Sequence, residues 1–327
     1  MVAGGNRDSS LGTLIKGAEM REYRQQERDL FLRDSLEQLT RLAIREDLGR
    51  GYDLTTLAIV PESLPATADI VSRVSGVACG IELIEWIVDC LQAPITVQTH
   101  VRDGAAFEPR QCLGTLEGNA RDILTCERTI LNFLGRLCGV ASWTAQHVAL
   151  VADLPVRIYD TRKTTPGWRQ LEKYAVRCGG GHNHRGSLNE AILIKDNHLA
   201  CLAAVDGKLL SPSQAVRRAR EFLRQQPDVS HDAIVEIEVD NLEMLADALT
   251  VDPDIVLLDN MPPQLLRQAV LMRNGANPEV QLEASGGIQL HTLRSFAETG
   301  VDRISLGALT HSAVNLDVGL DWRLAAC

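Results

Sequence analysis

The chain has 327 residues, of which 45% are hydrophobic and 4% aromatic, and it carries a formal net charge of −10. This length is enough for two domains or for one large α/β barrel. The negative charge argues against nucleic acid or an anionic membrane as a partner, because both favour a basic surface, but it leaves room for a local basic pocket.

The first third of the chain predicts a small α+β domain that follows a polar tail. Residues 1–20 are small and polar and are expected to be loosely ordered. A helix is predicted from Glu22 to Gly49, because apolar residues recur there at spacings of three and four. The pattern then predicts, in chain order, a strand in 66–80, a helix in 80–91, two strands around an Asp103–Gly104 turn in 95–118, and a long helix in 125–151.

The remainder of the chain alternates short apolar runs with helix-like segments. Six such runs end abruptly in polar or small residues: VRIYDTRKT (156–164), AILIKDNH (191–198), AIVEIEVD (233–240), DIVLLDN (254–260), VQLEASGG (280–287) and RISLGALTH (303–311). Helices between buried strands indicate a parallel sheet, which gathers its functional residues at the C-terminal strand ends. An open doubly wound sheet is the alternative. A barrel is favoured, because no G-x-G-x-x-G turn is present.

The predicted strand ends carry cations, carboxylates and small residues. The cations are Arg162, Lys163, Arg185 and Lys195, the carboxylates are Glu238 and Asp259, and the small groups are Ser285-Gly286-Gly287 and Gly307-Ala308-Leu309. Four cations at one mouth repel one another unless an anion lies between them, and arginine suits carboxylates and phosphates. Two carboxylates on neighbouring strands can hold Mg²⁺. The sequence therefore predicts a polyanionic ligand with Mg²⁺ as cofactor.

Residues near these positions also raise the question of a zinc site and of a nucleophilic lysine. The stretch GGGHNHR (179–185) offers two imidazoles, His182 and His184, without an evident third ligand, which disfavours zinc. Lys195 on an apolar strand also fits a Schiff-base nucleophile, as in barrel aldolases, and this alternative stays open. The eight cysteines form no C-x-x-C pair and no apolar run reaches the ~20 residues of a membrane span, so a cytoplasmic protein with reduced thiols is expected.

Two motifs together resemble those of a known enzyme family. DTRKTTPGWRQLEKYAVRCGGGHNHR (160–185), followed by LIKDNH (193–198), closely resembles quinolinate phosphoribosyltransferase, also called carboxylating nicotinate-nucleotide pyrophosphorylase. Further similar stretches are EDLGRGYDLTT (46–56), ERTILNFLGRLCGVAS (127–142), EASGGI (283–288) and SLGALTHS (305–312), so only about the first twenty residues lie outside the resemblance. One departure is RGSL (185–188), where the family more often has a larger residue directly after the arginine.

The resemblance implies a fold and an assembly. An N-terminal α/β open sandwich is expected over 21–130, with the C-terminal segment 312–327 packing back on it. An atypical parallel α/β barrel with fewer than eight strands is expected over 131–311. The family forms homodimers in which an arginine, Arg128 here, is donated to the partner's active site.

The resemblance also implies the reaction and the roles of the site residues. Phosphoribosyl is transferred from phosphoribosyl pyrophosphate to quinolinate, giving nicotinate mononucleotide, pyrophosphate and CO₂. Quinolinate would be bound by Arg128, Thr161, Arg162, Lys163, His184, Arg185 and Lys195. Glu238 and Asp259 would hold the ribose hydroxyls and Mg²⁺, and phosphate would be bound by Ser285, Gly286, Gly287, Gly307, Ala308 and Leu309, with His311 beside them. Lys173 is expected on an outer helix, away from this pocket. Rival functions are a transferase that uses nicotinate or another acidic heterocycle, and a regulatory protein that binds the nucleotide without turnover.

Overall fold

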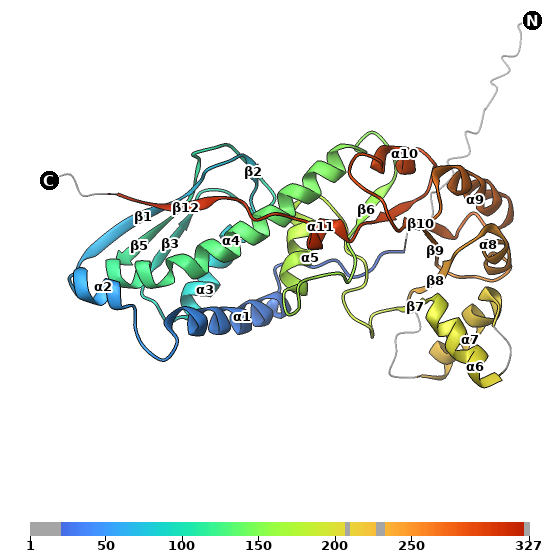
Figure 1. Ribbon diagram of the computed structural model, residues 1–327, viewed down its shortest axis with the longest axis horizontal. Coiled ribbons are helices and arrows are strands. Elements are labelled where there is room, and N and C mark those ends of the chain that lie inside the picture. Colours follow the sequence, from blue (N-terminus) through green and yellow to red (C-terminus); the bar gives the residue numbers. More distant parts are fainter. Residues whose placement is uncertain (1–20, 207–209, 227–232, 324–327) are drawn as a thin grey trace, which may run out of the picture.

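The computed structural model describes residues 21–206, 210–226 and 233–323. The expected tail, residues 1–20, lies outside these ranges. The molecule is a mixed α/β protein with an antiparallel sheet at one end and a parallel sheet at the other (Figure 1). None of the described helices has a stretch that is both long and apolar enough to span a lipid bilayer.

The antiparallel sheet has four strands in the order β12-β1-β5-β3. Their bounds are β1 (Pro65–Ser72), β3 (Thr96–Thr99), β5 (Cys112–Asn119) and β12 (Val318–Trp322). Ala68 and Ile70 of β1 are fully buried, whereas Asp69 between them binds Thr115 and Arg323. Apolar and polar side chains thus alternate between a covered face and an uncovered one, as expected of an open sandwich.

Helices cover one side of this sheet. The helical elements of this half are α1 (Leu30–Leu48), α2 (Leu54–Ile59), η1 (Ile81–Leu83), α3 (Ile84–Cys90) and the start of α4 (Ala120–Ala149). Helices α3 and α4 contact the sheet, and α1 packs on α3. Helix α4 continues without a break through the expected domain boundary at residue 130 and joins the two halves (Figure 1).

The parallel sheet has six strands in the order β6-β11-β10-β9-β8-β7, and every pair in it is parallel. The bounds are β6 (Arg157–Tyr159), β7 (Ile192–Ile194), β8 (Val235–Val239), β9 (Ile255–Asp259), β10 (Gln281–Ser285) and β11 (Arg303–Ser305). A parallel bridge between Tyr159 and His182 extends the pairing beyond β6. The expected parallel sheet of six strands is confirmed.

Helices follow the strands of this sheet and pack on its outer side. They are the end of α4, α5 (Arg169–Cys178), α6 (Asp196–Asp206), α7 (Pro212–Gln225), α8 (Leu242–Ala248), α9 (Pro263–Ala276), α10 (Leu293–Ala297) and α11 (Ala308–His311). All five residues of β8 are buried, with Val235, Ile237 and Val239 alternating with two glutamates. The apolar set faces the helices, so Glu236 and Glu238 face the inside of the curved sheet.

The prediction of a helix from Glu22 was wrong for its first turns. Helix α1 begins at Leu30, because the Asp29 side chain accepts the backbone N–H of Leu32 and caps it. Residues 21–29 are not helical and reach the parallel sheet instead. Gln281 and Arg303, which begin β10 and β11, donate to the carbonyl of Arg21.

The predicted pair of strands in 95–118 is also corrected. Strands β3 and β5 do pair, but a short strand, β4 (Ala106–Phe107), lies between them and pairs with β2 (Gly76–Val77). Asp103 therefore does not turn a tight hairpin. Its carboxylate accepts the backbone N–H groups of Gly80 and Ile81, which begin η1. At the other end of the chain, β12 pairs with β1, with Leu320 opposite Ile70.

Candidate active site

The C-terminal ends of neighbouring parallel strands bring charged residues together at one mouth. Glu238 lies near the end of β8, Asp259 ends β9 and Ser285 ends β10 opposite Asp259. Lys195 directly follows β7 and forms an ion pair with Glu238. These positions gather as expected, because parallel strands in register end at the same edge of the sheet.

The two carboxylates form an oxygen donor set. Burial raises the pKa of Glu238, Lys195 opposes the rise, and the charge of Asp259 adds to it. Two neighbouring carboxylates and no sulfur or nitrogen ligand suit a hard cation, so the residues present fit Mg²⁺. Lys195 is partly exposed and paired with a carboxylate. Its surroundings are therefore polar, unlike the apolar pocket expected for a Schiff-base lysine.

Two arginines at the mouth each have a buried N–H group without a hydrogen-bond partner in the described part of the chain. Arg162 follows β6, and Arg185 ends the GGGHNHR stretch; in each, the Nε atom is buried without a hydrogen-bond partner among the described residues. Burial lowers the pKa of Arg185, and the charge of Arg162 lowers it further. Unsatisfied buried donors with mutually repelling charges indicate a binding place for an anion.

Arg169, at the start of α5, belongs to the same cationic group and was not predicted. Burial and the charge of Arg162 lower its pKa. Its guanidinium donates to Thr164 Oγ1 at 3.1 Å and to the carbonyl of Gly186 at 3.3 Å. The signal that could have found it is the position of this arginine, only a few residues after the DTRKT stretch.

A second group of residues surrounds Lys163. A Cβ atom placed on Gly307 would lie 2.9 Å from Lys163 Cδ and 3.1 Å from His311 Nε2, so these residues converge at the start of α11. Thr161 Oγ1 accepts the backbone N–H of Lys163 at 3.0 Å. Leu309 is fully buried, and its backbone N–H donates to the carbonyl of Leu306 at 3.4 Å.

The conformation of the loop after β10 requires glycine. Gly286 has a φ of +90°, and a Cβ on it would lie 2.3 Å from Asn260 Oδ1. Gly287 has a φ of +64°. Asn260 itself donates to the Ser285 carbonyl at 2.9 Å and to Asp259 Oδ2 at 2.7 Å, and it was not predicted. The close approach of the two loops leaves their backbone as the surface offered to a ligand.

His184 lies below the mouth, inside the sheet, rather than at its surface. Its side chain is almost fully buried, with Nε2 3.0 Å from Glu236 and 3.6 Å from Glu283. Its Nδ1 accepts the backbone N–H of Arg185 at 2.9 Å. Burial favours a lower pKa, but the two carboxylates outweigh it and raise the pKa of His184. Both ring nitrogens therefore have protein partners, and His184 stabilises the position of Arg185 from inside the sheet.

The glycines of GGGHNHR pack against a helix instead of a ligand. A Cβ on Gly179 would lie 2.4 Å from the Ala141 carbonyl of α4, and one on Gly181 would lie 2.8 Å from Thr144. Of the loop residues that follow, His182 forms a parallel β-bridge with Tyr159 of β6, whereas His184 and Arg185 are buried. These glycines therefore allow the loop to pack closely on α4.

The expectation for Lys173 was wrong. It lies on α5 as expected, but its side chain is only 2% exposed and points under the mouth. Its ammonium forms an ion pair with Asp160 and donates to the carbonyl of His184 at 2.7 Å. Lys173 therefore fixes the loop that carries His184 and Arg185.

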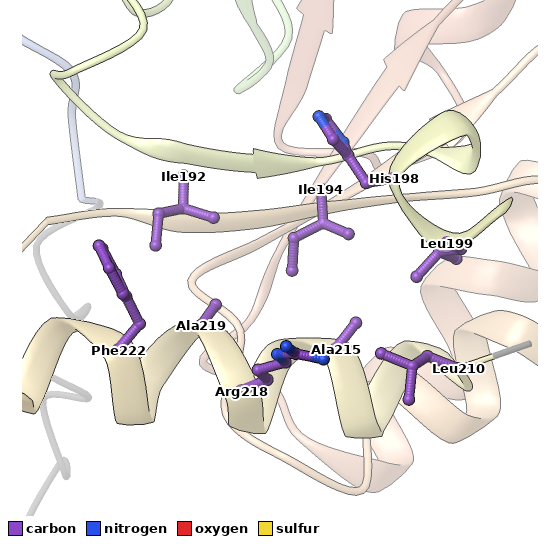
Figure 2. Close-up of a pocket in the computed structure, with 9 residues that line it drawn as sticks. All are labelled: Ile192, Ile194, His198, Leu199, Leu210, Ala215, Arg218, Ala219 and Phe222. Carbon is purple, nitrogen blue, oxygen red and sulfur yellow. The ribbon is translucent and has the colours of Figure 1, made fainter. Parts of the chain in front are cut away.

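Arg128 stands apart from the residues above. It is exposed on the first third of α4, next to the antiparallel sheet, and forms no hydrogen bond or ion pair with another described residue. A separate apolar cavity of about 290 Å³ lies between β7 and α7 (Figure 2). Ile192, Ile194 and Phe222 line it, and none of the predicted site residues does.

Comparisons with known proteins cover most of the chain. Residues 53–138 match the family model "Quinolinate phosphoribosyl transferase, N-terminal domain", and residues 140–321 match the C-terminal domain of the same family. A carboxylating nicotinate-nucleotide pyrophosphorylase of Mycobacterium leprae is 41% identical over 290 residues, which are 88% of this chain and 97% of the relative. A probable one of Bacillus subtilis is 38% identical over 86% of this chain and 91% of its own length. The solved nicotinate-nucleotide pyrophosphorylase of Francisella tularensis superposes with a TM-score of 0.81 at 34% identity, covering 92% of this chain and all of that one.

Proposed function

Because the chain belongs to the quinolinate phosphoribosyl transferase family and converts quinolinate to nicotinate mononucleotide in NAD biosynthesis, we propose that this reaction takes place at the mouth of the parallel sheet. This placement rests on one observation: the Nε donors of Arg162 and Arg185 are buried without a hydrogen-bond partner among the described residues. Quinolinate has two adjacent carboxylates, and guanidinium forks suit such groups. We assign these two arginines to the carboxylates, with Thr161 and Lys195 at the border.

Phosphoribosyl pyrophosphate occupies the neighbouring part of the mouth. The glycine loop Ser285–Gly287 and the start of α11 offer backbone N–H groups to the 5′-phosphate, with Lys163 and His311 beside them. Glu238 and Asp259 hold the ribose hydroxyls and Mg²⁺. When bound, Mg²⁺ supplies positive charge next to the pyrophosphate group.

The residues of the chain act by positioning and by charge. Lys163 stabilises the negative charge that develops on pyrophosphate as it leaves C1 of the ribose. Arg162 and Arg185 hold quinolinate so that its ring nitrogen faces C1 and forms the new bond. The positive ring nitrogen then lets the C2 carboxylate leave as CO₂, because the ring holds the electron pair left on C2 until it takes up a proton. No covalent bond to Lys195 is required.

The active unit is a homodimer in the cytoplasm. Arg128 is exposed and lacks a partner within the described chain, which suits a residue donated to a second subunit. Apolar side chains are exposed around α2, where Tyr52, Leu54 and Ile59 each have more than 70% of their surface accessible. Such a patch supports an interface. Seven cysteines in the described residues are free, which suits a reducing compartment.

The test is release of labelled CO₂ from carboxyl-labelled quinolinate. We expect release only when phosphoribosyl pyrophosphate and Mg²⁺ are both present, and loss of release when the metal is chelated. Nicotinate serves as the control substrate for nucleotide formation. Nucleotide formed from nicotinate with no CO₂ from quinolinate would favour the transferase for another acidic heterocycle. Binding of phosphoribosyl pyrophosphate without any product would favour the regulatory alternative.

A further inference from the structure

The segment before α1, residues 21–28, closes the lower end of the parallel sheet, at the start of its strands. Glu22 accepts hydrogen bonds from Arg157 and from Tyr159 at the two ends of β6. Arg21 forms an ion pair with Asp254 at 3.1 Å, just before β9. This segment lies outside both family-model matches, the first of which begins at residue 53 and the second at residue 140. We refer to residues 21–28 as the N-terminal strap.

Tyr23 of the strap is buried beneath the substrate mouth. Only 3% of it is exposed, and its ring stacks on His184 with 4.4 Å between ring centroids. Its hydroxyl donates to Glu236, the carboxylate that also binds His184 Nε2. Tyr23 therefore restrains the imidazole both through its ring and through a shared partner.

Gln25 and Gln26 of the strap bind the same loop one position earlier, at Asn183. The Gln25 side chain accepts the backbone N–H of Asn183 at 2.8 Å and donates to its carbonyl at 3.1 Å. The Gln26 backbone N–H donates to Asn183 Oδ1 at 2.7 Å. Asn183 is 1% exposed and directly precedes His184 and Arg185. The strap thus holds both the backbone and the imidazole of the loop that presents Arg185.

The buried cluster around His184 combines cationic and anionic side chains. Buried His–Glu–Glu sets also bind divalent metals in other proteins. Here Arg303 Nε lies 3.2 Å from Glu283, and His184 Nε2 lies 3.0 Å from Glu236, whose charge helps to raise the pKa of His184. Both oxygens of Glu283 are buried without a hydrogen-bond partner among the described residues, so its contacts are ion pairs rather than hydrogen bonds.

We propose that the N-terminal strap sets the position of Arg185 through His184 and Asn183, and that Tyr23 is a positioning residue for quinolinate. The inference rests on the proposed function, because Arg185 is taken to bind a quinolinate carboxylate. Tyr23 itself does not touch the substrate. Its loss changes where the guanidinium stands, while the carboxylates and glycine loops that bind phosphoribosyl pyrophosphate keep their places.

The experiment compares Tyr23→Phe and Tyr23→Leu with the same changes at Tyr174. Tyr174 is a matched control, because it is also buried and donates its hydroxyl to a carboxylate, Asp103, away from the cluster. We expect Tyr23→Leu to raise the KM for quinolinate about tenfold, since small displacements of a positioned group are costly. Tyr23→Phe, which keeps the stacked ring, should raise it only about threefold. The KM for phosphoribosyl pyrophosphate should stay within about twofold in both.

The outcomes separate a role of Tyr23 in positioning Arg185 from a role in the stability of the fold alone. Thermal unfolding of all four variants is measured alongside, and the Tyr174 variants should lose stability without a change in the KM for quinolinate. An unchanged KM for quinolinate in both Tyr23 variants would overturn the proposal, as would an equal rise for both substrates. Absence of CO₂ release from the unsubstituted protein would instead contradict the proposed function, and would be seen before any variant is compared. Calorimetric binding of quinolinate to unsubstituted protein and to Tyr23→Leu tests the positioning role without turnover.

Discussion

Asp160 connects three segments beneath the substrate mouth. It is fully buried, pairs with the ammonium of Lys173, and accepts Asn183 Nδ2 at 2.7 Å and the backbone N–H of His184 at 2.9 Å. Burial raises the pKa of Asp160, and Lys173 opposes the rise. A buried charge of this kind is stable only while its partners remain. The buried Lys173 is therefore expected to contribute to stability, whereas the exposed Lys163 is expected to act on the substrate.

Replacing each lysine by methionine separates the contribution to stability from the contribution to activity. Lys173→Met leaves the Asp160 carboxylate buried without its cation and should lower the free energy of unfolding by about 3–5 kcal/mol. Lys163→Met removes an exposed charge, so the free energy of unfolding should stay within about 0.5 kcal/mol. It should lower kcat/KM for phosphoribosyl pyrophosphate about a hundredfold, because a charge-stabilising donor is lost. Urea unfolding and steady-state kinetics on both variants provide the measurement; Lys173→Met with unchanged stability would contradict the assignment.

The sequence pattern could not reveal the burial of Lys173. Its neighbour Glu172 is also fully buried and pairs with Arg136 of α4. Two consecutive charged residues have no helical periodicity that marks them as inward-facing. Their burial depends on Asp160 and Arg136, which lie on other elements and come close only in the folded chain.

At the scale of elements, the six parallel strands were predictable and the N-terminal strap was not. Short apolar runs such as 254–260 mark buried strands, and parallel pairing then places their polar ends together. Residues 21–28 have no comparable pattern, because nearly all of them are polar and their partners lie on several different elements. His184 was misplaced for a related reason: motif spacing gives its neighbours in sequence, whereas Glu236 and Glu283 set its depth.

The glycine loop after β10 gives a prediction at this scale. Gly286→Ala combines an unfavourable positive φ with a Cβ that meets Asn260, so the loop has to shift. We expect a loss of about 1–3 kcal/mol in the free energy of unfolding and a higher KM for phosphoribosyl pyrophosphate. Gly275→Ala, near the end of α9, is the control, since a Cβ there meets nothing within 4 Å and should be neutral or slightly stabilising. Equal behaviour of the two variants would argue against a phosphate-binding loop.

At the scale of the whole molecule, two connections bind the sheets into one body. Helix α4 runs from the antiparallel sheet to the parallel one, and the chain returns after α11 so that β12 completes the antiparallel sheet (Figure 1). Arg136 of α4 also donates to the carbonyls of Thr310 and Ala313 on this return path. These contacts hold the sandwich half in place, as the proposed donation of Arg128 to a second subunit requires.

A subunit-exchange experiment tests whether the active site is shared. Arg128→Ala and Lys163→Ala homodimers should each be nearly inactive, because every site lacks one cation. After exchange, half of the dimers are mixed, and each has one site with both defects and one site with none. Activity should then recover to about a quarter of the unsubstituted level per site. If Arg128 instead served its own subunit, both sites of a mixed dimer would stay defective and mixing would restore nothing.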